Sequence, residues 1–176
     1  MKVGVGENDP KTLKEAQDSF SRSELTEDGA GFVGAEVLYE FDLKDEANKL
    51  GVKLGVDVFG QNKLEFYSPT YGQATETTLA LPLTVYYKRD NGVKGWSPFV
   101  GAGVSFFRTQ IKEDDTKDHK SKVVPHIAAG AEYRFTNLFA LGFEAKYTFN
   151  AKLEKKGVVY SDHTGFSGAI TGRFYF

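Results

Sequence analysis

Three groups of residues have types and spacings that could do chemistry. His119-Lys120-Ser121 places a histidine two residues before a serine, and a serine nucleophile needs an adjacent base. Asp114, Asp115, Asp118 and His119 supply ligand types suited to a metal ion. Gly29–Gly34 reads Gly-Ala-Gly-Phe-Val-Gly, which matches the glycine fingerprint of dinucleotide-binding proteins.

Each group also has a simpler interpretation. The first triplet lies in a predicted charged loop, and the nearby His126-Ile127-Ala128 lacks the serine. The run 112–122 alternates in sign, which is typical of a solvated loop. The glycine motif opens a predicted strand, whereas dinucleotide binding needs the N-terminus of a helix. We therefore predict no enzyme activity, no catalytic residues, no metal site and no cofactor.

Composition narrows the class of protein. The chain has 176 residues, which predicts a single domain over 1–176, and it has no cysteine for a disulfide framework. A formal charge of -2 lacks the basic field of a nucleic-acid binder, so we expect no nucleic-acid partner. Mean hydropathy is -0.38, and no run approaches the roughly 18 apolar residues of a membrane helix. The 19 glycines and the 14% aromatic content favour a β-rich protein.

Apolar and polar residues alternate with a period of two along most of the chain, which is typical of β-strands. Eight segments show it: 2–6, 31–43, 49–60, 75–88, 96–108, 123–135, 138–150 and the C-terminal strand from Phe166 to Phe176. The connections alternate between long (7–30, 61–74, 109–122, 151–163) and short (44–48, 89–95, 136–137). This alternation predicts an all-β, eight-stranded antiparallel up-and-down transmembrane β-barrel, with all long loops at one end and both termini at the other. Residues 13–20 could form one or two helical turns.

The C-terminal strand indicates which face meets the surroundings. Its apolar and glycine positions end on Phe174 and Phe176, and a terminal ring on an apolar face suits a lipid interface. Aromatic residues gather at the short-turn ends of the apolar faces, as an interfacial belt requires: Tyr39, Phe41, Tyr87, Trp96, Tyr133, Phe135, Phe139, Phe174 and Phe176. A soluble barrel with its apolar face inward would alternate equally well, so this alternative stays open.

The opposite faces carry charges of both signs and glycines. We predict an interior charge network of Glu36, Glu40, Lys53, Asp57, Glu132, Arg134, Glu144, Lys146 and Arg173. Counting all inward positions gives seven acids (Glu36, Glu40, Asp42, Asp57, Glu76, Glu132, Glu144) and seven bases (Lys2, Lys49, Lys53, Lys88, Arg134, Lys146, Arg173). Balanced signs favour a closed, ion-paired interior over a selective pore. We expect Glu40 opposite Lys53, and Arg173 near Glu132 or Glu144.

Two stretches carry a resemblance to a known family. Gly172-Arg173-Phe174-Tyr175-Phe176 resembles the terminal signature of bacterial outer-membrane barrels, and 98–104 (Pro-Phe-Val-Gly-Ala-Gly-Val) resembles a strand of small OmpA-like, OmpW-like and opacity-type barrels. The resemblance implies a porin-like Gram-negative outer-membrane location, contact with outer-membrane lipid and lipopolysaccharide, and recognition of the last strand by the barrel assembly machinery. The N-terminal residues carry no signal peptide, so we expect the chain to begin at the mature form with an added Met1.

Function is then expected to lie in the surface-exposed loops. Phe66, Tyr67 and Tyr71 form an exposed aromatic group suited to an extracellular protein or glycan, although packing on the barrel rim explains them equally well. We expect a monomeric structural anchor that displays loops for adhesion or interaction. The alternative is a narrow channel or transporter for small or hydrophobic solutes.

Overall fold

The computed structural model describes residues 1–6, 23–27, 31–43, 47–60, 62–68, 70–113, 116–155 and 158–175. Its elements are twelve strands: β1 (Lys2–Gly6), β2 (Ser23–Glu27), β3 (Gly31–Asp42), β4 (Asn48–Phe59), β5 (Asn62–Ser68), β6 (Thr70–Arg89), β7 (Trp96–Glu113), β8 (Thr116–Arg134), β9 (Phe139–Thr148), β10 (Lys152–Lys155), β11 (Val158–Asp162) and β12 (Gly165–Phe174). Within these ranges, no helix has the length and apolar character needed to cross a membrane.

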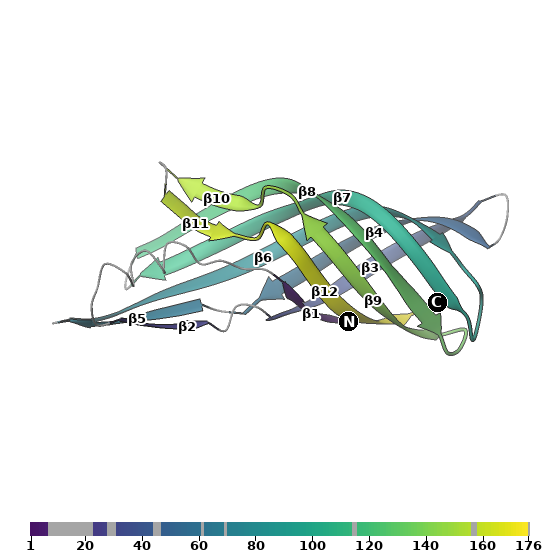
Figure 1. Ribbon diagram of the computed structural model, residues 1–176, viewed down its shortest axis with the longest axis horizontal. Coiled ribbons are helices and arrows are strands. Elements are labelled where there is room, and N and C mark those ends of the chain that lie inside the picture. The colour runs from purple at the N-terminus through teal and green to yellow at the C-terminus, as the bar shows by residue number, and fades with distance from the viewer. Residues whose placement is uncertain are drawn as a thin grey trace.

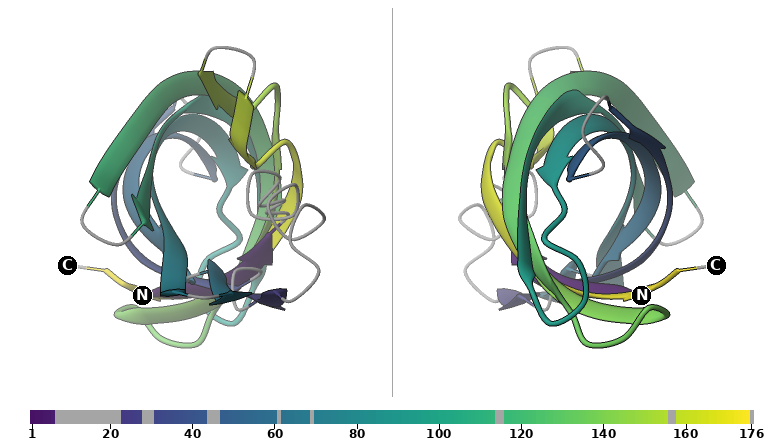
Figure 2. Two further views of the ribbon diagram at one scale, coloured as in Figure 1. Left: turned by 90° about the vertical axis from the view of Figure 1, so that its left-hand side faces the viewer. Right: turned by 90° about the vertical axis from the view of Figure 1, so that its right-hand side faces the viewer.

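Eight of the strands form a closed ring. The hydrogen-bonded order β6-β4-β3-β1-β12-β9-β8-β7 returns to β6 through the β6–β7 pairing, and every pairing is antiparallel. Figure 2 shows this ring along the long axis of the molecule. Neighbours in the ring are also neighbours among these eight strands in sequence, because an up-and-down barrel needs only hairpin connections. The predicted eight-stranded antiparallel barrel is confirmed.

The long connections contain more sheet than the sequence predicts. β7 and β8 stay paired from Trp96↔Tyr133 up to Glu113↔Thr116, and β5 pairs with the first part of β6. The predicted loops 61–74 and 109–122 are therefore wrong, because both are strands that run beyond the ring (Figure 1). These hairpins carry mostly polar side chains, so no apolar face reveals them, yet backbone pairing continues unchanged.

Two other long connections also hold strands. The 151–163 connection contains the β10–β11 hairpin, and the 7–30 connection contains β2, which pairs with β5. The predicted helical turns at 13–20 lie outside the described residues. At the opposite end of the ring, only a few residues separate β3 from β4, β6 from β7 and β8 from β9, as the sequence predicts.

The termini differ from the prediction. Residues Arg173 and Phe174 end β12 near the short turns, but Met1 lies part-way along the wall, where its ammonium donates to the carbonyl of Gly172 at 3.0 Å. The prediction that both termini lie at the short-turn end is therefore wrong for the N-terminus. The N-terminus lies part-way along the wall because Lys2 pairs with Gly34, whereas β3 continues to Asp42 at the short-turn end.

Side chains alternate between the two faces of the wall. Val37 is 77% exposed, Ile170 64% and Phe174 69%, whereas Lys88 and Glu132 are fully buried. Most large apolar side chains thus point away from the ring, and charged side chains point into it together with a few aromatic rings. The alternative of a soluble barrel with an apolar interior is therefore wrong.

Glycines on the inward face make room for rings. A Cβ built on Gly51 would lie 2.3 Å from the ring of Tyr86, and one on Gly130 would lie 2.6 Å from the ring of Phe99. A Cβ never approaches another atom so closely. Any residue other than glycine at these two positions would therefore collide with the rings. The inward glycines therefore let large side chains fill a narrow lumen.

Candidate functional site

The middle of the lumen holds a group of charged residues that we name the central cluster: Lys2, Lys53, Asp57, Glu144 and Lys146. Asp57 Oδ2 lies 3.4 Å from Lys2 Nζ and 3.3 Å from Lys146 Nζ. Glu144 pairs with Lys53 and, at 3.4 Å, with Lys2. Each of these side chains is at most 5% exposed, so the charges depend on one another rather than on water.

A second group lies nearer the short turns, and we name it the turn-side cluster: Glu36, Glu40, Lys88, Glu132 and Arg173. Arg173 Nε lies 3.0 Å from Glu36 Oε1, and Arg173 Nη1 lies 2.5 Å from Glu132 Oε2. Lys88 lies 2.5 Å from Glu40 and 3.0 Å from Glu132. The hydroxyls of Tyr86 and Tyr175 donate to Glu40 and Glu132, respectively, so the carboxylates are also hydrogen-bonded.

Glu36 joins the two clusters. Its Oε1 accepts from Arg173 at 3.0 Å, and its Oε2 lies 3.7 Å from Lys53. Together the clusters contain five cations (Lys2, Lys53, Lys88, Lys146, Arg173) and five anions (Glu36, Glu40, Asp57, Glu132, Glu144). The central cluster alone has one extra cation and the turn-side cluster one extra anion. The contact through Glu36 therefore neutralises the described network as a whole.

The predicted opposition of Glu40 and Lys53 is wrong. Glu40 faces Gly51 across the β3–β4 ladder, and its cation is Lys88. Lys53 faces Leu38 and reaches Glu144 on β9 across the lumen. In a narrow barrel of tilted strands, side chains from strands that are not adjacent meet inside the lumen. The two residues of an ion pair therefore need not lie opposite each other on adjacent strands. Arg173 does contact Glu132, as one of its two predicted partners, but it does not pair with Glu144.

Asp90 organises the rim at the short-turn end. Its carboxylate lies 3.1 Å from Arg134 and 3.4 Å from Lys49, and it accepts from the backbone N–H of Gly92 at 2.9 Å. Burial alone would raise the pKa of Asp90. The Gly92 N–H and the Arg134 guanidinium outweigh burial, with help from nearby lysines, and hold this pKa below its ordinary value. Arg134 therefore belongs to the rim rather than to the clusters deeper inside.

Above the central cluster the lumen becomes less polar. The ring nitrogens of His126 lie 2.8 Å from the hydroxyl of Thr84 and 2.9 Å from that of Ser105. At the long-hairpin end we name an aromatic layer of Phe32, Phe59, Phe107 and His163. The ring of His163 stacks on Phe107 at 5.1 Å between centroids, and Phe59 lies 5.2 Å from Phe32. This layer covers the lumen above the charges.

Sequence reasoning missed the aromatic layer, although a signal was present. Phe59 follows Lys53 and Asp57 at even spacing on β4, and Phe107 continues the inward positions of β7. The period-two alternation of these two strands therefore indicates that both rings point into the lumen. His163 carried no such signal, because it was assigned to the external connections, yet it is only 4% exposed.

The structure places some of the residues that the sequence singled out for chemistry or for loop contacts. His119 and Ser121 are exposed residues of β8, so their assignment to a loop is wrong. Asp114 and Asp115 lie outside the described residues, as does Gly29 of the glycine motif. Phe66, Tyr67 and Tyr71 belong to β5 and β6, where Tyr67 pairs with Tyr71 across the ladder. No catalytic role follows from these positions, and the absence of enzyme activity stays a prediction.

Outward aromatic rings form two rows. Near the short turns, ring contacts run from Trp96 to Tyr133, Phe135, Phe139 and Phe174 at centroid distances between 4.8 and 6.0 Å. Tyr39 and Phe41 pack edge to face in the same row. Tyr87 lies on the same outer face, while Phe176 lies outside the described residues. A second row, Tyr147 with Phe149 and Phe166, lies higher on β9 and β12. Valine, leucine and isoleucine occupy the outer wall between the rows.

Comparison with protein families settles what these features belong to. The model of the outer membrane protein beta-barrel domain matches residues 1–172. The chain belongs to this family. Among solved structures, it is similar to the N-terminal β-barrel domain of Pseudomonas aeruginosa OprF, with 15% identity and a TM-score of 0.39 over 82% of this chain and 96% of that one. No curated protein matches the chain.

Membership of the outer-membrane barrel family explains the outer surface. In a bilayer, an apolar wall of this kind faces hydrocarbon, and the placement of the two aromatic rows at the levels of the headgroups stays a prediction. Strands β9 and β12 each have ten residues, and a tilted membrane strand needs about 9–11. The outer-membrane barrel thus exposes to lipid what a soluble protein would bury, and keeps its charges inside.

We predict strong coupling between Lys53 and Glu144. Lys53→Met or Glu144→Gln alone leaves a partly uncompensated buried charge and should cost about 3 kcal/mol of unfolding free energy. The double variant should cost about 1–3 kcal/mol less than the sum of the single variants. Urea unfolding of the refolded protein in micelles measures these energies.

The matched control combines Lys53→Met with Asp90→Asn. Asp90 pairs with Arg134 and Lys49 at the rim rather than with Lys53 or Glu144, so these two effects should add. Additive losses for Lys53 and Glu144 would contradict the assigned pairing.

We also predict an acid-sensitive contribution from Asp90. Because its pKa is lower in the folded than in the unfolded protein, its stabilisation is complete above the unfolded value, about 3.9, and is lost as the pH falls through the folded value. The stability advantage of the native protein over Asp90→Asn should therefore be largest near neutral pH and shrink below about pH 4. Urea midpoints measured across this range test the prediction, and an advantage that grows on acidification would contradict it.

Proposed function

We propose that this outer-membrane barrel is a non-conducting anchor that displays its long hairpins for structural or adhesive contact. The observation that carries the proposal is the filled lumen. Two linked ion-pair clusters occupy its lower and middle parts, and the aromatic layer lies above them. A pore selective for ions favours one sign of charge and a continuous aqueous path, and neither property suits this interior.

The hairpins support the contact role. β6, β7 and β8 have 20, 18 and 19 residues, although about ten suffice to cross the membrane. The surplus forms paired ribbons beyond the ring, and the aromatic group Phe66, Tyr67 and Tyr71 lies on one of them. Tyrosine and phenylalanine are frequent in protein and glycan contacts, so an extracellular protein or glycan is the proposed partner.

The barrel surface suggests further partners. The apolar wall and its two aromatic rows suit outer-membrane lipid and lipopolysaccharide, with the protein as a monomer. Strand β12 begins its outward row with Phe166 and ends on Phe174, and we propose that the barrel assembly machinery recognises this strand. The location in the bacterial outer membrane follows from the family.

A narrow channel or transporter is the second candidate. It is favoured by a cavity of about 630 Å³ at the short-turn end, lined in part by Glu36, Glu40 and Arg173. To conduct, the barrel would have to open both ion-pair clusters and the aromatic layer. We therefore rank this function second.

The proposal predicts no stable single-channel steps when the refolded protein is inserted into planar bilayers. A trimeric porin in the same bilayers provides the positive control, and heat-modifiable gel migration shows that the sample is folded. Reproducible unitary steps from the native barrel would favour the channel and reject the closed anchor.

The contact role predicts that replacing Phe66, Tyr67 and Tyr71 with serine reduces adherence of expressing cells to immobilised matrix protein or glycan by at least tenfold, about 1.4 kcal/mol of contact energy. His119→Ser, on the other long hairpin, is the matched control and should leave adherence unchanged. Unchanged adherence of the folded triple variant, with equal surface amounts, would reject this aromatic group as the contact site.

A further inference from the structure

The apolar outer face of β7 ends in a cation near the long hairpins. Side chains alternate along this strand, and Phe107 and Thr109 are buried in the lumen. Phe106 and Arg108 lie on the opposite face and are exposed. Every outward position of β7 from Trp96 to Phe106 is apolar, and Arg108 follows as the next outward residue. The outer face therefore changes from apolar to charged within a single outward step.

The length of β7 sets the height of Arg108. From Trp96 to Phe106 the strand advances by about 33 Å, at 3.3 Å per residue. A tilt near 40° leaves about 25 Å of this along the membrane normal, which is the usual height of the apolar band of an outer-membrane barrel. Arg108 comes about 5 Å farther along the normal. A barrel embedded along this band therefore has Arg108 at the level of the lipid headgroups.

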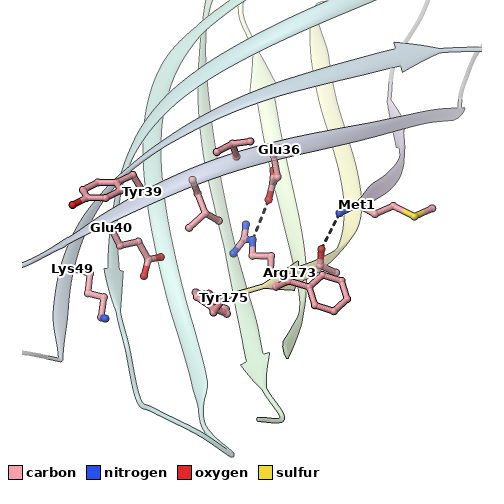
Figure 3. A pocket seen from close by; sticks show the side chains of 11 residues that line it. Met1, Glu36, Tyr39, Glu40, Lys49, Arg173 and Tyr175 are labelled. Atoms are coloured by element: carbon pink, nitrogen blue, oxygen red, sulfur yellow. Dashed lines mark hydrogen bonds and ion pairs between the residues drawn. The ribbon is translucent and has the colours of Figure 1, made fainter. Parts of the chain in front are cut away.

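Arg108 pairs with no carboxylate among the described residues. Its partners across the ladder are Leu79 of β6 and Ser121 of β8, and neither carries a charge. Arg173, in contrast, is ion-paired inside the lumen with Glu36 at 3.0 Å (Figure 3). An exposed guanidinium beside an apolar wall is most stable with an anion close by, so an anion from outside the chain suits Arg108.

Two exposed polar side chains flank Arg108 on the outer face. Ser121 is its partner across the β7–β8 ladder, and Gln110 follows it on the same face of β7. Cross-strand partners are about 5 Å apart, and successive residues on one face of a strand are about 7 Å apart, so all three side chains can reach one phosphate group. The guanidinium supplies paired N–H donors that match two phosphate oxygens, and the hydroxyl and the amide add further donors.

We propose that Arg108, Ser121 and Gln110 bind the phosphate monoester of a membrane lipid in the leaflet on the long-hairpin side. This site rests on the contact between the outer wall and outer-membrane lipid proposed above. A lipid is favoured over free phosphate because Phe106 and Val123, which are 36% and 60% exposed, pair across the ladder directly beside the site. The phosphate can therefore meet the donors while the acyl chains lie on the apolar wall.

Strand β6 offers a matched control at the other end of the wall. Arg89 is also exposed, and it follows the outward ring of Tyr87 by two residues, just as Arg108 follows Phe106. Its partner across the β4–β6 ladder is Asn48, at the short-turn end. Replacing Arg89 therefore removes the same charge from the outer face and leaves the proposed site intact.

A lipid titration tests the site. The refolded protein in micelles of an uncharged detergent is titrated with phosphatidic acid, and the amide NMR shifts of residues 106–110 and 119–123 report binding. Arg108→Gln should raise the dissociation constant about tenfold, because the phosphate loses its paired donors, and Arg89→Gln should leave it unchanged. Arg108→Lys keeps the charge without the paired donors and should also bind more weakly than the native protein. Heat-modifiable gel migration shows that each variant is folded.

Two further ligands identify what the site recognises. Diacylglycerol has no phosphate and should not shift these amides, and inorganic phosphate has no acyl chains and should bind about tenfold more weakly than phosphatidic acid. Equal losses for Arg108→Gln and Arg89→Gln, or equal affinities for inorganic phosphate and phosphatidic acid, would overturn the proposal. Equal shifts with diacylglycerol and phosphatidic acid would overturn phosphate recognition but leave the lipid contact of the wall in place. No shift with either lipid would contradict the lipid contact at this part of the wall as well.

Discussion

Charge neutrality inside a narrow lumen is the constraint on which the rest of this barrel depends. Ten ionic groups lie where water can reach few of them, and each is stable only because an opposite charge is within contact distance. Glu36 is critical in this arrangement, because it shares its two oxygens between Arg173 and Lys53 and so balances two clusters of unequal charge. The inward glycines serve the same constraint, since the rings of Tyr86 and Phe99 fill the remaining space only where Gly51 and Gly130 lack a side chain.

The membrane sets the complementary constraint on the outside. An apolar wall that would aggregate in water is the stable surface in hydrocarbon, and the sheet must then pair its backbone all the way round. The ring meets this condition at six of its eight seams, where the shorter of the two strands is paired along most of its length. The two seams of β1, with β3 and with β12, are shorter, because β1 has only five residues.

Much of the architecture was predictable from the sequence. Positions that face lipid are apolar and positions that face the lumen are mostly polar, so residue type alternates along each strand of the ring. Val37 and Glu36 alternate on β3 as lipid and lumen require, and the eight ring strands follow from that signal. The ribbons of β7 and β8 beyond the ring were not predictable, because no alternation of apolar and polar residues marks them in the sequence. The partners of Glu40 and Lys53 were not predictable either, since they depend on tilt and stagger across the lumen rather than on neighbouring strands.

The longest strands extend beyond the part of the barrel that lies in the membrane. At about 3.3 Å per residue, β8 extends roughly 60 Å, and a tilt near 40° leaves about 45 Å along the membrane normal. The apolar band takes up about 25 Å of that height. The ladder between β7 and β8 therefore carries the described end of β8 about 20 Å beyond the apolar band, as a hydrogen-bonded ribbon. A partner that binds this ribbon, as proposed above, would meet a backbone that is already ordered, so little conformational entropy would be lost on binding.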